Sequence, residues 1–524
     1  MRTAQSLQDE IEKANHEADE RMRRAWSQDG TSSPATPYSK AKRIRGQALA
    51  EKNHMEPHWP GERTDFEIDR DQVIFNANFA RLARKTQVFI GQGDVLYKNR
   101  LMHTLEVVQF ARSVAKKNNL NVDLAEAIAY GHDIGHTPFG HAGEEALNQC
   151  LFELHIRRLL NWGAPANVEL GRGDDTHARR DQVLWTMVQS LVGRYPEHDG
   201  DARLLTKTDV SRLVSADLFN EIHSKKIICI EADKCFLAHP YDWSWPNGQK
   251  DIMVQDFWLQ KGHRDYFLHN VHALRVLLCD TSRPKNDVTF QTAWGILAHS
   301  GRQYEEFNCY LAEGMKPLKK SDHQTNEAFL VQQSDDICFA NSDLDDADRS
   351  KIIRDFKDLP EPQRTTVWRL AAENPTVKNS WPRPSQRLQF LETGFHFDSV
   401  AQLEYKYEDR VKAAREIVQL LVYPVLVQRQ VSAKRMIRDL FWFYSAYSAA
   451  QPRRDVEIAA WEQLKSFFVD SNRKGELDDN TPERLAVDFI AHMTDDETMA
   501  AYRALFAPDQ SHWARHFMRE KADS

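Results

Sequence analysis

The sequence contains no run of about 18 apolar residues, which is the length that a membrane-spanning helix requires. Its first residues, MRTAQSLQDEIEKANHEADERMRR, are charged and lack the apolar region of a secretory signal. We therefore expect a cytoplasmic protein with no membrane anchor. No C-x-x-C pair is present, and reduced, mostly buried thiols are expected. The six cysteines are Cys150, Cys229, Cys235, Cys279, Cys309 and Cys338.

An excess of positive charge is also absent, because 77 acidic residues outnumber 69 basic ones. A protein with this balance is not expected to coat nucleic acid, although a local basic patch remains compatible with it. The 41% hydrophobic content is typical of a globular protein. At 524 residues the chain is too long for one compact core, so we expect two or three subdomains.

Alternating apolar and polar residues are scarce, and no internal repeat is evident. Apolar residues instead recur at helical spacing in several segments, so the predicted fold class is mainly α. The expected organisation is an N-terminal tail and linker, a helical core in two parts, an insertion or lobe between those parts, and a helical C-terminal region. These divisions are residues 1–60, 61–150 and 266–350, 151–265, and 351–524.

The first 60 residues look peripheral. The stretch DGTSSPATPYSK is rich in turn-forming residues and is typical of a linker, and the basic segment KAKRIRG follows it. We favour a solvated tail for this region. The alternative is an arm that docks on a neighbouring subunit or on a phosphate-rich ligand.

The segment GHDIGHTPFGHAGEE places three histidines and three acids within residues 131–145. Its adjacent His132 and Asp133 offer an imidazole nitrogen and a carboxylate oxygen to one metal. Such mixed ligation suits Mn²⁺, Fe²⁺, Zn²⁺ or Ni²⁺, and Mg²⁺ less well. A lone His-Asp pair more often caps a helix end. Here it ends an apolar helix and is followed by glycines, His136 and His141, so a functional and a structural interpretation are evenly balanced.

Seven segments, taken in chain order, resemble motifs of the deoxyguanosine triphosphate triphosphohydrolase family, a branch of the HD superfamily. The resemblance extends from residue 63 to residue 506, with a poorly matching stretch at about 150–265. It implies an HD-domain helical core with a helical C-terminal region and an inserted lobe. The segments are residues 81–89, 100–115, 132–148, 266–278, 289–300, 334–347 and 484–506.

The resemblance implies one divalent metal held by His103, His132, Asp133 and Asp335. The expected ion is Mn²⁺ or Mg²⁺, with Fe²⁺, Ni²⁺ and Zn²⁺ as alternatives. Asp233 in IEADKCFLAHPYD is a rival fourth ligand. We prefer Asp335 because it follows the YFLHN helix, as the family order requires. Two histidines and two aspartates would leave two octahedral positions for water and a substrate oxygen.

The resemblance also implies roles around the metal. His141 would move a proton at the reacting phosphate, and Glu144 would fix its tautomer and raise its pKa. Arg100 lies one helical turn before His103 and would neutralise phosphate charge. The other expected substrate contacts are Gln87 at the deoxyribose, Asp343 at the 3′-hydroxyl, Arg435 from the C-terminal helices, and Phe339, His269 and Asn270.

Three residues depart from the family pattern. Phe339 stands where the family usually has tyrosine, Leu268 replaces an acid, and His269 replaces the glycine of a Gly-Asn pair. His269 and His272 would line the phosphate path or lie on the surface, and we favour the surface for His272. These departures leave the substrate preference open.

The predicted function is metal-dependent hydrolysis of a deoxynucleoside triphosphate, dGTP or another, to the deoxynucleoside and inorganic triphosphate. One alternative is an HD phosphohydrolase that acts on a monophosphate or a modified nucleotide. The other is a non-catalytic member that binds nucleotides or nucleic acid. The resemblance also implies a homo-oligomer, a hexamer or tetramer, with a nucleotide or single-stranded DNA as an effector in some members.

Overall fold

The computed structural model describes the chain in a set of separate segments. It divides into two compact units. Unit 1 comprises Met1–Gly140, His269–Val431 and Asp470–Arg473, and unit 2 comprises the remainder. The described residues are 4–26, 35–38, 41, 63–87, 98–159, 228–231, 234–237, 267–279, 288–298, 325–349, 356–378, 380–398, 402–421, 423–446, 455–470 and 482–506.

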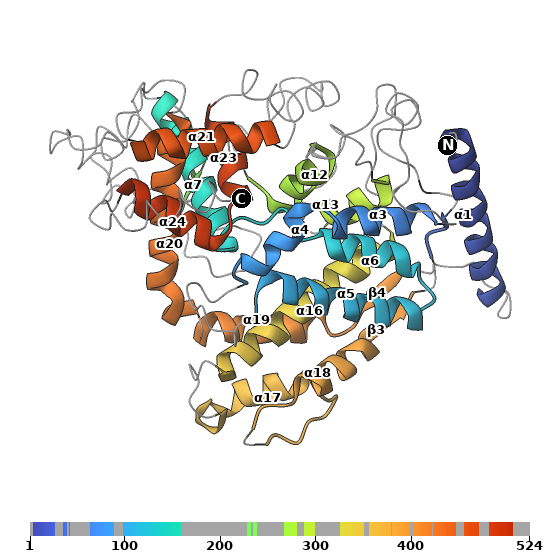
Figure 1. Ribbon diagram of the computed structural model, residues 1–524. Helices are drawn as coiled ribbons and strands as arrows, with labels where there is room; N and C mark the ends of the chain where they lie inside the picture. The colour runs from blue at the N-terminus through green and yellow to red at the C-terminus, as the bar shows by residue number, and fades with distance from the viewer. Residues whose placement is uncertain are drawn as a thin grey trace. The chain divides into compact units, whose positions relative to one another are not determined.

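Unit 1 is built from helices with one short strand pair among its described residues (Figure 1). Its elements are α1 (Ala4–Trp26), α3 (Asp65–Ile74), α4 (Ala77–Arg81), η2 (Leu82–Arg84), α5 (Arg100–Lys117), α6 (Val122–Gly131), α12 (His269–Cys279), α13 (Phe290–Ala298), α16 (Asn326–Arg349), η4 (Phe356–Asp358), α17 (Glu361–Arg369), α18 (Pro384–Leu391), η5 (Glu392–Gly394), β3 (Phe395–Phe397), β4 (Leu403–Tyr405) and α19 (Glu408–Leu421).

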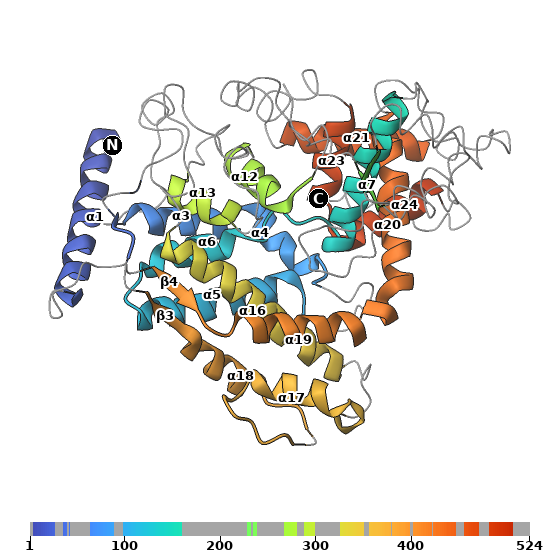
Figure 2. The same cartoon turned by 180° about the vertical axis from the view of Figure 1, so that it is seen from behind.

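The long helix α16 lies at the centre of unit 1. It packs against α5, α6 and α13 on one side and against α18, α19 and β4 on the other (Figure 2). Strands β3 and β4 pair antiparallel, with Phe395 opposite Tyr405. The helices α3 and α13 also pack on α6. The mainly α prediction is therefore confirmed, and unit 1 joins residues from both predicted parts of the core.

The helix starts follow from their capping residues. The Asn99 side chain accepts from the Met102 amide at the start of α5, and the Asn121 side chain accepts from the Leu124 amide at the start of α6. Each contact satisfies an amide that has no partner within the first helical turn. The apolar sequence of α6 is almost wholly buried, which fits its position among α3, α5, α13 and α16.

The buried face of α5 is not purely apolar. Val108, Ala111 and Val114 are buried, whereas Leu105 is 41% exposed. The buried face instead includes the polar residues Arg100, His103 and Thr104. A hydrophobic pattern cannot locate such a face, because the residues that the site requires do not look apolar.

The described part of the N-terminal region packs on the core. The Asn15 amide donates to Asp65 over 2.9 Å, and the Tyr38 amide donates to Asp19 over 2.7 Å. Both Asn15 and Asp19 are buried. The favoured interpretation of a solvated tail is therefore wrong for these residues, since they make specific hydrogen bonds. Most of KAKRIRG lies outside the described residues.

Unit 2 is described separately. Aromatic rings fill its interior: Phe443 stacks on Trp461 at 5.6 Å, and Tyr444 meets Phe489 edge-on at 5.0 Å. Arg438 donates to the buried Glu153 over 3.0 Å. Most of the predicted insertion at 151–265 lies outside the described residues. The elements are α7 (His141–Leu159), β1 (Ile228–Glu231), β2 (Lys234–Leu237), α20 (Tyr423–Ser445) from Ser432 onward, α21 (Asp455–Asp470), α23 (Pro482–His492) and α24 (Asp495–Phe506).

Among the helices of the described residues, none is both long enough and apolar enough to cross a bilayer.

Glu327 fixes the N-terminal segment to the core of unit 1. Its carboxylate accepts from the Thr36 amide and hydroxyl over 3.0 and 2.7 Å and from the Asn121 amide over 2.9 Å. We predict that Glu327→Ala lowers the free energy of unfolding by about 2–4 kcal/mol, because buried donors lose their acceptor. Urea denaturation followed by circular dichroism measures this loss. The exposed Glu361→Ala is the matched control, and equal effects of the two substitutions would contradict the prediction.

Candidate metal centre

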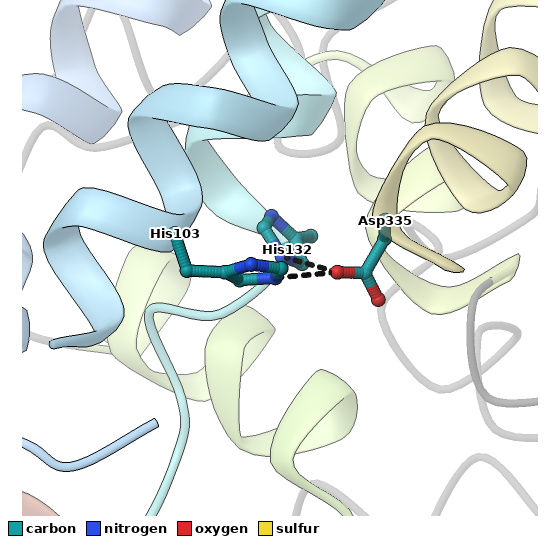
Figure 3. Close-up of side chains that lie close together, drawn as sticks. All are labelled: His103, His132 and Asp335. Carbon is teal, nitrogen blue, oxygen red and sulfur yellow. Dashed lines mark hydrogen bonds and ion pairs between the residues drawn. The ribbon is translucent and has the colours of Figure 1, made fainter. Parts of the chain in front are cut away.

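Three buried or half-buried side chains meet inside unit 1. His103 comes from α5, His132 directly follows α6, and Asp335 comes from α16. The Oδ1 atom of Asp335 lies 2.6 Å from Nε2 of His103 and 3.5 Å from Nε2 of His132. Figure 3 shows both imidazoles reaching this one carboxylate oxygen.

The orientation of His132 is set by the backbone. Its Nδ1 lies 2.7 Å from the carbonyl oxygen of Ala129. A carbonyl only accepts hydrogen bonds, so Nδ1 carries the proton and Nε2 presents its lone pair in the neutral ring. A backbone acceptor on the distal nitrogen is the usual support of a metal-binding histidine.

Asp133 lies at the edge of this group. Its Oδ2 is 3.6 Å from Nε2 of His132 and accepts a 2.9 Å hydrogen bond from Nη1 of Arg100. Both side chains are almost fully buried. Arg100 therefore holds the carboxylate of Asp133 in place and compensates its charge.

The electrostatics favour a cation at this position. Burial by itself lowers the pKa of His132, but Asp133 and Asp335 outweigh burial and raise it to about 9. Burial by itself raises the pKa of Asp133, but Arg100 and His132 outweigh it, so this pKa lies well below its usual range. Two ionised carboxylates next to imidazole nitrogens attract positive charge, whether it is carried by protons or by a metal.

The donor set fits a divalent metal. Ligand atoms bound to one ion at roughly 2.0–2.2 Å lie about 2.9–3.5 Å apart. Asp335 Oδ1 lies 2.6 and 3.5 Å from Nε2 of His103 and His132, and Asp133 Oδ2 lies 3.6 Å from Nε2 of His132. His103, His132 and Asp335 thus form one group that could hold a metal ion, and Asp133 lies at its edge.

Arg100 has donors to spare. Its Nε and Nη2 atoms are buried and have no hydrogen-bond partner among the described residues. Gly140, at a φ of +59°, lies against this guanidinium, and a Cβ there would meet Nη2 at 2.5 Å. The preceding Phe139 also has a positive φ, of 61°. Two consecutive left-handed residues thus shape the turn that covers Arg100.

Gln87 lies beside the same turn. Thr86 bridges to Asn99, and the Arg100 amide donates to the Lys85 carbonyl over 3.1 Å. A Cβ at Gly140 would also lie 3.3 Å from the Gln87 carbonyl oxygen. The segment that contains Gln87 is therefore next to Arg100.

Phe339 and Asp343 lie farther along α16. The Phe339 ring meets the His103 ring edge-on at 6.3 Å, and the Arg415 guanidinium lies 5.4 Å from the Phe339 ring centre. Asp343 is buried, and neither of its carboxylate oxygens has a hydrogen-bond partner among the described residues. Burial and the neighbouring Asp346 raise the pKa of Asp343 well above its usual range.

The start of α12 contributes two histidines and an asparagine, and all three are buried. The His269 ring stacks on the His136 ring at 3.9 Å. The Asn270 amide donates to the Ile296 carbonyl over 3.2 Å, which ties α12 to α13. The preference for a surface position of His272 is wrong, because this side chain is only 4% exposed. Most residues in the first two turns of helix α12 are buried. Its three polar residues would instead lead one to expect an exposed face.

His136 is the residue near the site to which the sequence argument assigned no role. It is buried, and its Nε2 lies 3.6 Å from Oδ1 of Asp133. The signal was present in GHDIGH, where a second histidine follows the His-Asp pair by three residues. Spacing of this kind places both side chains on one side of a helical turn.

The other predicted site residues belong to unit 2 or lie outside the described residues. In unit 2, Nδ1 of His141 is 3.7 Å from Oε2 of Glu144, and the His141 side chain is 60% exposed. Arg435 is 76% exposed and lies 3.7 Å from Asp439. Asp233 lies outside the described residues.

Part of this centre lies in a segment that resembles a known family. Residues 100–171 match the HD domain family. The chain contains an HD domain. The matched range includes His103, His132 and Asp133, whereas Asp335 lies beyond it on α16 and joins them through the packing of unit 1.

Relatives that carry the name deoxyguanosinetriphosphate triphosphohydrolase-like protein resemble the chain. One from Caldanaerobacter subterraneus is 51% identical over 117 residues, which are 22% of this chain and 33% of that protein. One from Rickettsia prowazekii is 59% identical over 93 residues, which are 18% and 24%. These matches thus span a third or less of the relatives' length. One from Azoarcus is 26% identical over 474 residues, which are 86% of this chain and 93% of that protein.

We predict that the group of His103, His132, Asp133 and Asp335 binds a divalent metal and that losing a ligand weakens this binding. His132→Ala and Asp335→Asn should each lower Mn²⁺ affinity by roughly 10- to 100-fold, as the loss of a coordinating or supporting group does. Isothermal titration calorimetry on the metal-free protein measures the change. His396→Ala, which removes an exposed histidine of unit 1, is the control. Unchanged affinity in both ligand variants would show that the metal binds elsewhere.

Proposed function

We propose that this chain is a metal-dependent phosphohydrolase that converts a deoxynucleoside triphosphate to the deoxynucleoside and inorganic triphosphate. The proposal depends above all on the group of His103, His132 and Asp335, with Asp133 beside His132. The names of the relatives, which specify a deoxyguanosinetriphosphate triphosphohydrolase-like protein, support the choice of substrate class.

The reaction is a substitution at the α-phosphorus of the nucleotide. Water adds to this phosphorus, the bond to the 5′-oxygen breaks, and the 5′-oxygen leaves with a proton. When a divalent metal is bound, it acts as a Lewis acid toward the phosphate and lowers the pKa of water. Mn²⁺ suits two imidazoles and two carboxylates better than Mg²⁺ does, and Fe²⁺, Ni²⁺ and Zn²⁺ suit them as well.

Arg100 is proposed to bind the phosphate that reacts. One of its nitrogens holds Asp133, while Nε and Nη2 remain available for oxygens of a ligand. A guanidinium donates two parallel hydrogen bonds to a phosphate, and in a buried site these bonds stabilise charge that grows in the transition state. Arg100 thereby connects the metal ligands to the substrate.

His141 is proposed to exchange the proton that the 5′-oxygen requires. Its Nδ1 faces Glu144 at 3.7 Å, an arrangement that orients the ring. Nε2 is then the nitrogen left to hold the exchanging proton. This role rests on the family resemblance of the PFGH segment and on the local pair.

The sugar contacts are proposed from α16 and from the turn that contains Gln87. Asp343 is a buried carboxyl with a raised pKa, and its oxygens suit a hydrogen bond with a 3′-hydroxyl. Phe339 offers an apolar edge without a phenol hydroxyl. Asn270 and Arg435 remain further proposed contacts, although the Asn270 amide already serves the contact between α12 and α13.

The wider setting is proposed from the same resemblance. We infer a cytoplasmic homo-oligomer, a hexamer or a tetramer, with a nucleotide or single-stranded DNA as its effector. Size-exclusion chromatography with light scattering, carried out with and without dGTP, tests the assembly.

A substrate panel tests the proposed reaction. The purified chain is incubated with Mn²⁺ and each of the four common deoxynucleoside triphosphates, and inorganic triphosphate is measured by ion chromatography. We predict triphosphate release from at least one of them. Phosphate release from a monophosphate, with no triphosphate from any deoxynucleoside triphosphate, would assign the chain to another class of HD phosphohydrolase. Nucleotide binding without any hydrolysis would indicate a non-catalytic protein.

The role of Arg100 is tested by Arg100→Lys, which keeps a positive charge beside Asp133 and removes the second donor. We predict a fall in kcat of roughly 10²- to 10³-fold, because a transition-state contact is lost. Arg112→Lys on the same helix is the control, since Arg112 is 52% exposed and pairs with Glu126. Steady-state kinetics with the best substrate measure kcat for both variants. A wild-type kcat in Arg100→Lys would remove Arg100 from the mechanism.

A further inference from the structure

A fully buried arginine connects α18 to the turn of α16 that carries Asp343. Helix α18 packs against α16 in unit 1 (Figure 2). Arg387, from the middle of α18, is 0% exposed and is among the largest fully buried side chains of the described residues. The proposed reaction assigns no role to it. A buried guanidinium is costly unless its charge is compensated, so its partners show which part of the molecule it holds in place.

The partners of Arg387 on α16 belong to one helical turn. Its Nε donates to Oδ1 of Asn341 over 2.6 Å, and its Nη2 donates to the backbone carbonyl of Asn341 over 3.3 Å. The same Nη2 pairs with Oδ1 of Asp345. Its Nη1 donates to the carbonyl of Pro382, just before α18. Because all three nitrogens are used, the rigid fork of the guanidinium fixes this turn of α16 relative to α18.

Asp343 lies on the opposite side of the same turn. Residues two positions apart are about 200° apart around an α-helix, so Asp343 is directed away from both partners of Arg387. It lies on the side that carries Phe339, four residues earlier, and Asp335, one turn before that. Arg387 therefore supports α16 from behind, whereas the front of the helix carries the residues assigned to the metal and the nucleotide.

The carboxylate of Asp343 is not fixed by hydrogen bonds of its own. The side chain is 1% exposed, and neither oxygen has a hydrogen-bond partner among the described residues. Its position therefore follows from the turn that carries it. The neighbouring Ser342 hydroxyl donates to Glu106 of α5 over 2.9 Å and accepts from Nζ of Lys98 over 3.2 Å. Charged side chains thus hold this turn from two directions.

We propose that Arg387 is a positioning residue for recognition of the sugar. It fixes the turn of α16 so that Asp343 meets the 3′-hydroxyl of the nucleotide, and it thereby sets the preference for substrates that carry this hydroxyl. A group that is already in place binds its ligand without a further cost of ordering. The inference rests on the proposed function, in which Asp343 contacts the 3′-hydroxyl. Arg387 acts through α16 and needs no contact with the substrate.

The test compares the best deoxynucleoside triphosphate with its 2′,3′-dideoxy analogue on the Mn²⁺-loaded full-length chain. Arg387→Met removes the fork and keeps an unbranched side chain. It should raise KM for the substrate with the 3′-hydroxyl by roughly 5- to 20-fold, because a hydrogen bond to a charged group is weakened. The kcat/KM for the dideoxy analogue and the Mn²⁺ affinity should stay close to wild type. Arg383→Met, at the exposed start of α18, is the matched control and should change neither nucleotide's KM.

A double variant separates positioning from a general loss of structure. Asp343→Ala should reduce the preference for the 3′-hydroxyl. Adding Arg387→Met to it should reduce this preference no further, because residues that act through one contact are not additive. Arg387→Lys, which keeps a positive charge beside Asp345, serves as the second variant in case the methionine variant fails to fold. It should show an intermediate preference.

Three outcomes overturn the proposal. The first is a preference for the 3′-hydroxyl that Arg387→Met and Arg387→Lys leave unchanged, including an equal fall in kcat/KM for both nucleotides. This result would give Arg387 a structural role only and leave the proposed function intact. The second is a further fall of the preference in the Asp343→Ala background, which would show that Arg387 acts through another group. The third is a wild type that releases triphosphate from no deoxynucleoside triphosphate, which would remove the proposed function and this inference with it.

Discussion

The contact of Asp335 with His103 and His132 joins three helical segments in the interior of unit 1. Because α16 carries this carboxylate, its packing against α5 and α6 is what brings the three side chains together. A buried carboxylate is costly unless charge or hydrogen bonds compensate it. The imidazoles supply that compensation in the protein alone, and a divalent ion would supply more of it. Fold and metal site thus depend on the same group of side chains.

Arg100 is proposed to connect the group of Asp335, His103 and His132 to the substrate. It neutralises Asp133 with one nitrogen and keeps two donors aimed into the same interior. The left-handed turn at Phe139 and Gly140 gives the guanidinium room, since only a hydrogen stands where a Cβ would collide with it. The strain of that turn is typical of a functional site rather than of a connecting loop. The position of Arg100 therefore depends both on the carboxylate of Asp133 and on the backbone of the turn at Phe139 and Gly140.

Much of this arrangement could be predicted from the sequence. The helical class follows from periodicity, and the GHDIGH segment points to His132 and Asp133. His103 and Asp335 needed the family resemblance, because nothing local distinguishes them from other polar residues of their helices. The burial of polar residues could not be predicted from the sequence. His272 was expected on the surface, whereas the buried faces of α5 and α12 carry histidine or arginine. Contacts such as those of Glu327 depend on tertiary packing that composition does not reveal.

The central claim is that one divalent ion is bound by His103, His132, Asp133 and Asp335. Anomalous diffraction from a crystal of the Mn²⁺-loaded protein, recorded at the manganese edge, tests it most directly. The account predicts an anomalous peak at roughly 2.0–2.3 Å from a nitrogen of each histidine and an oxygen of each aspartate. A peak bound by other residues, with Asp335 outside coordination distance, would contradict it.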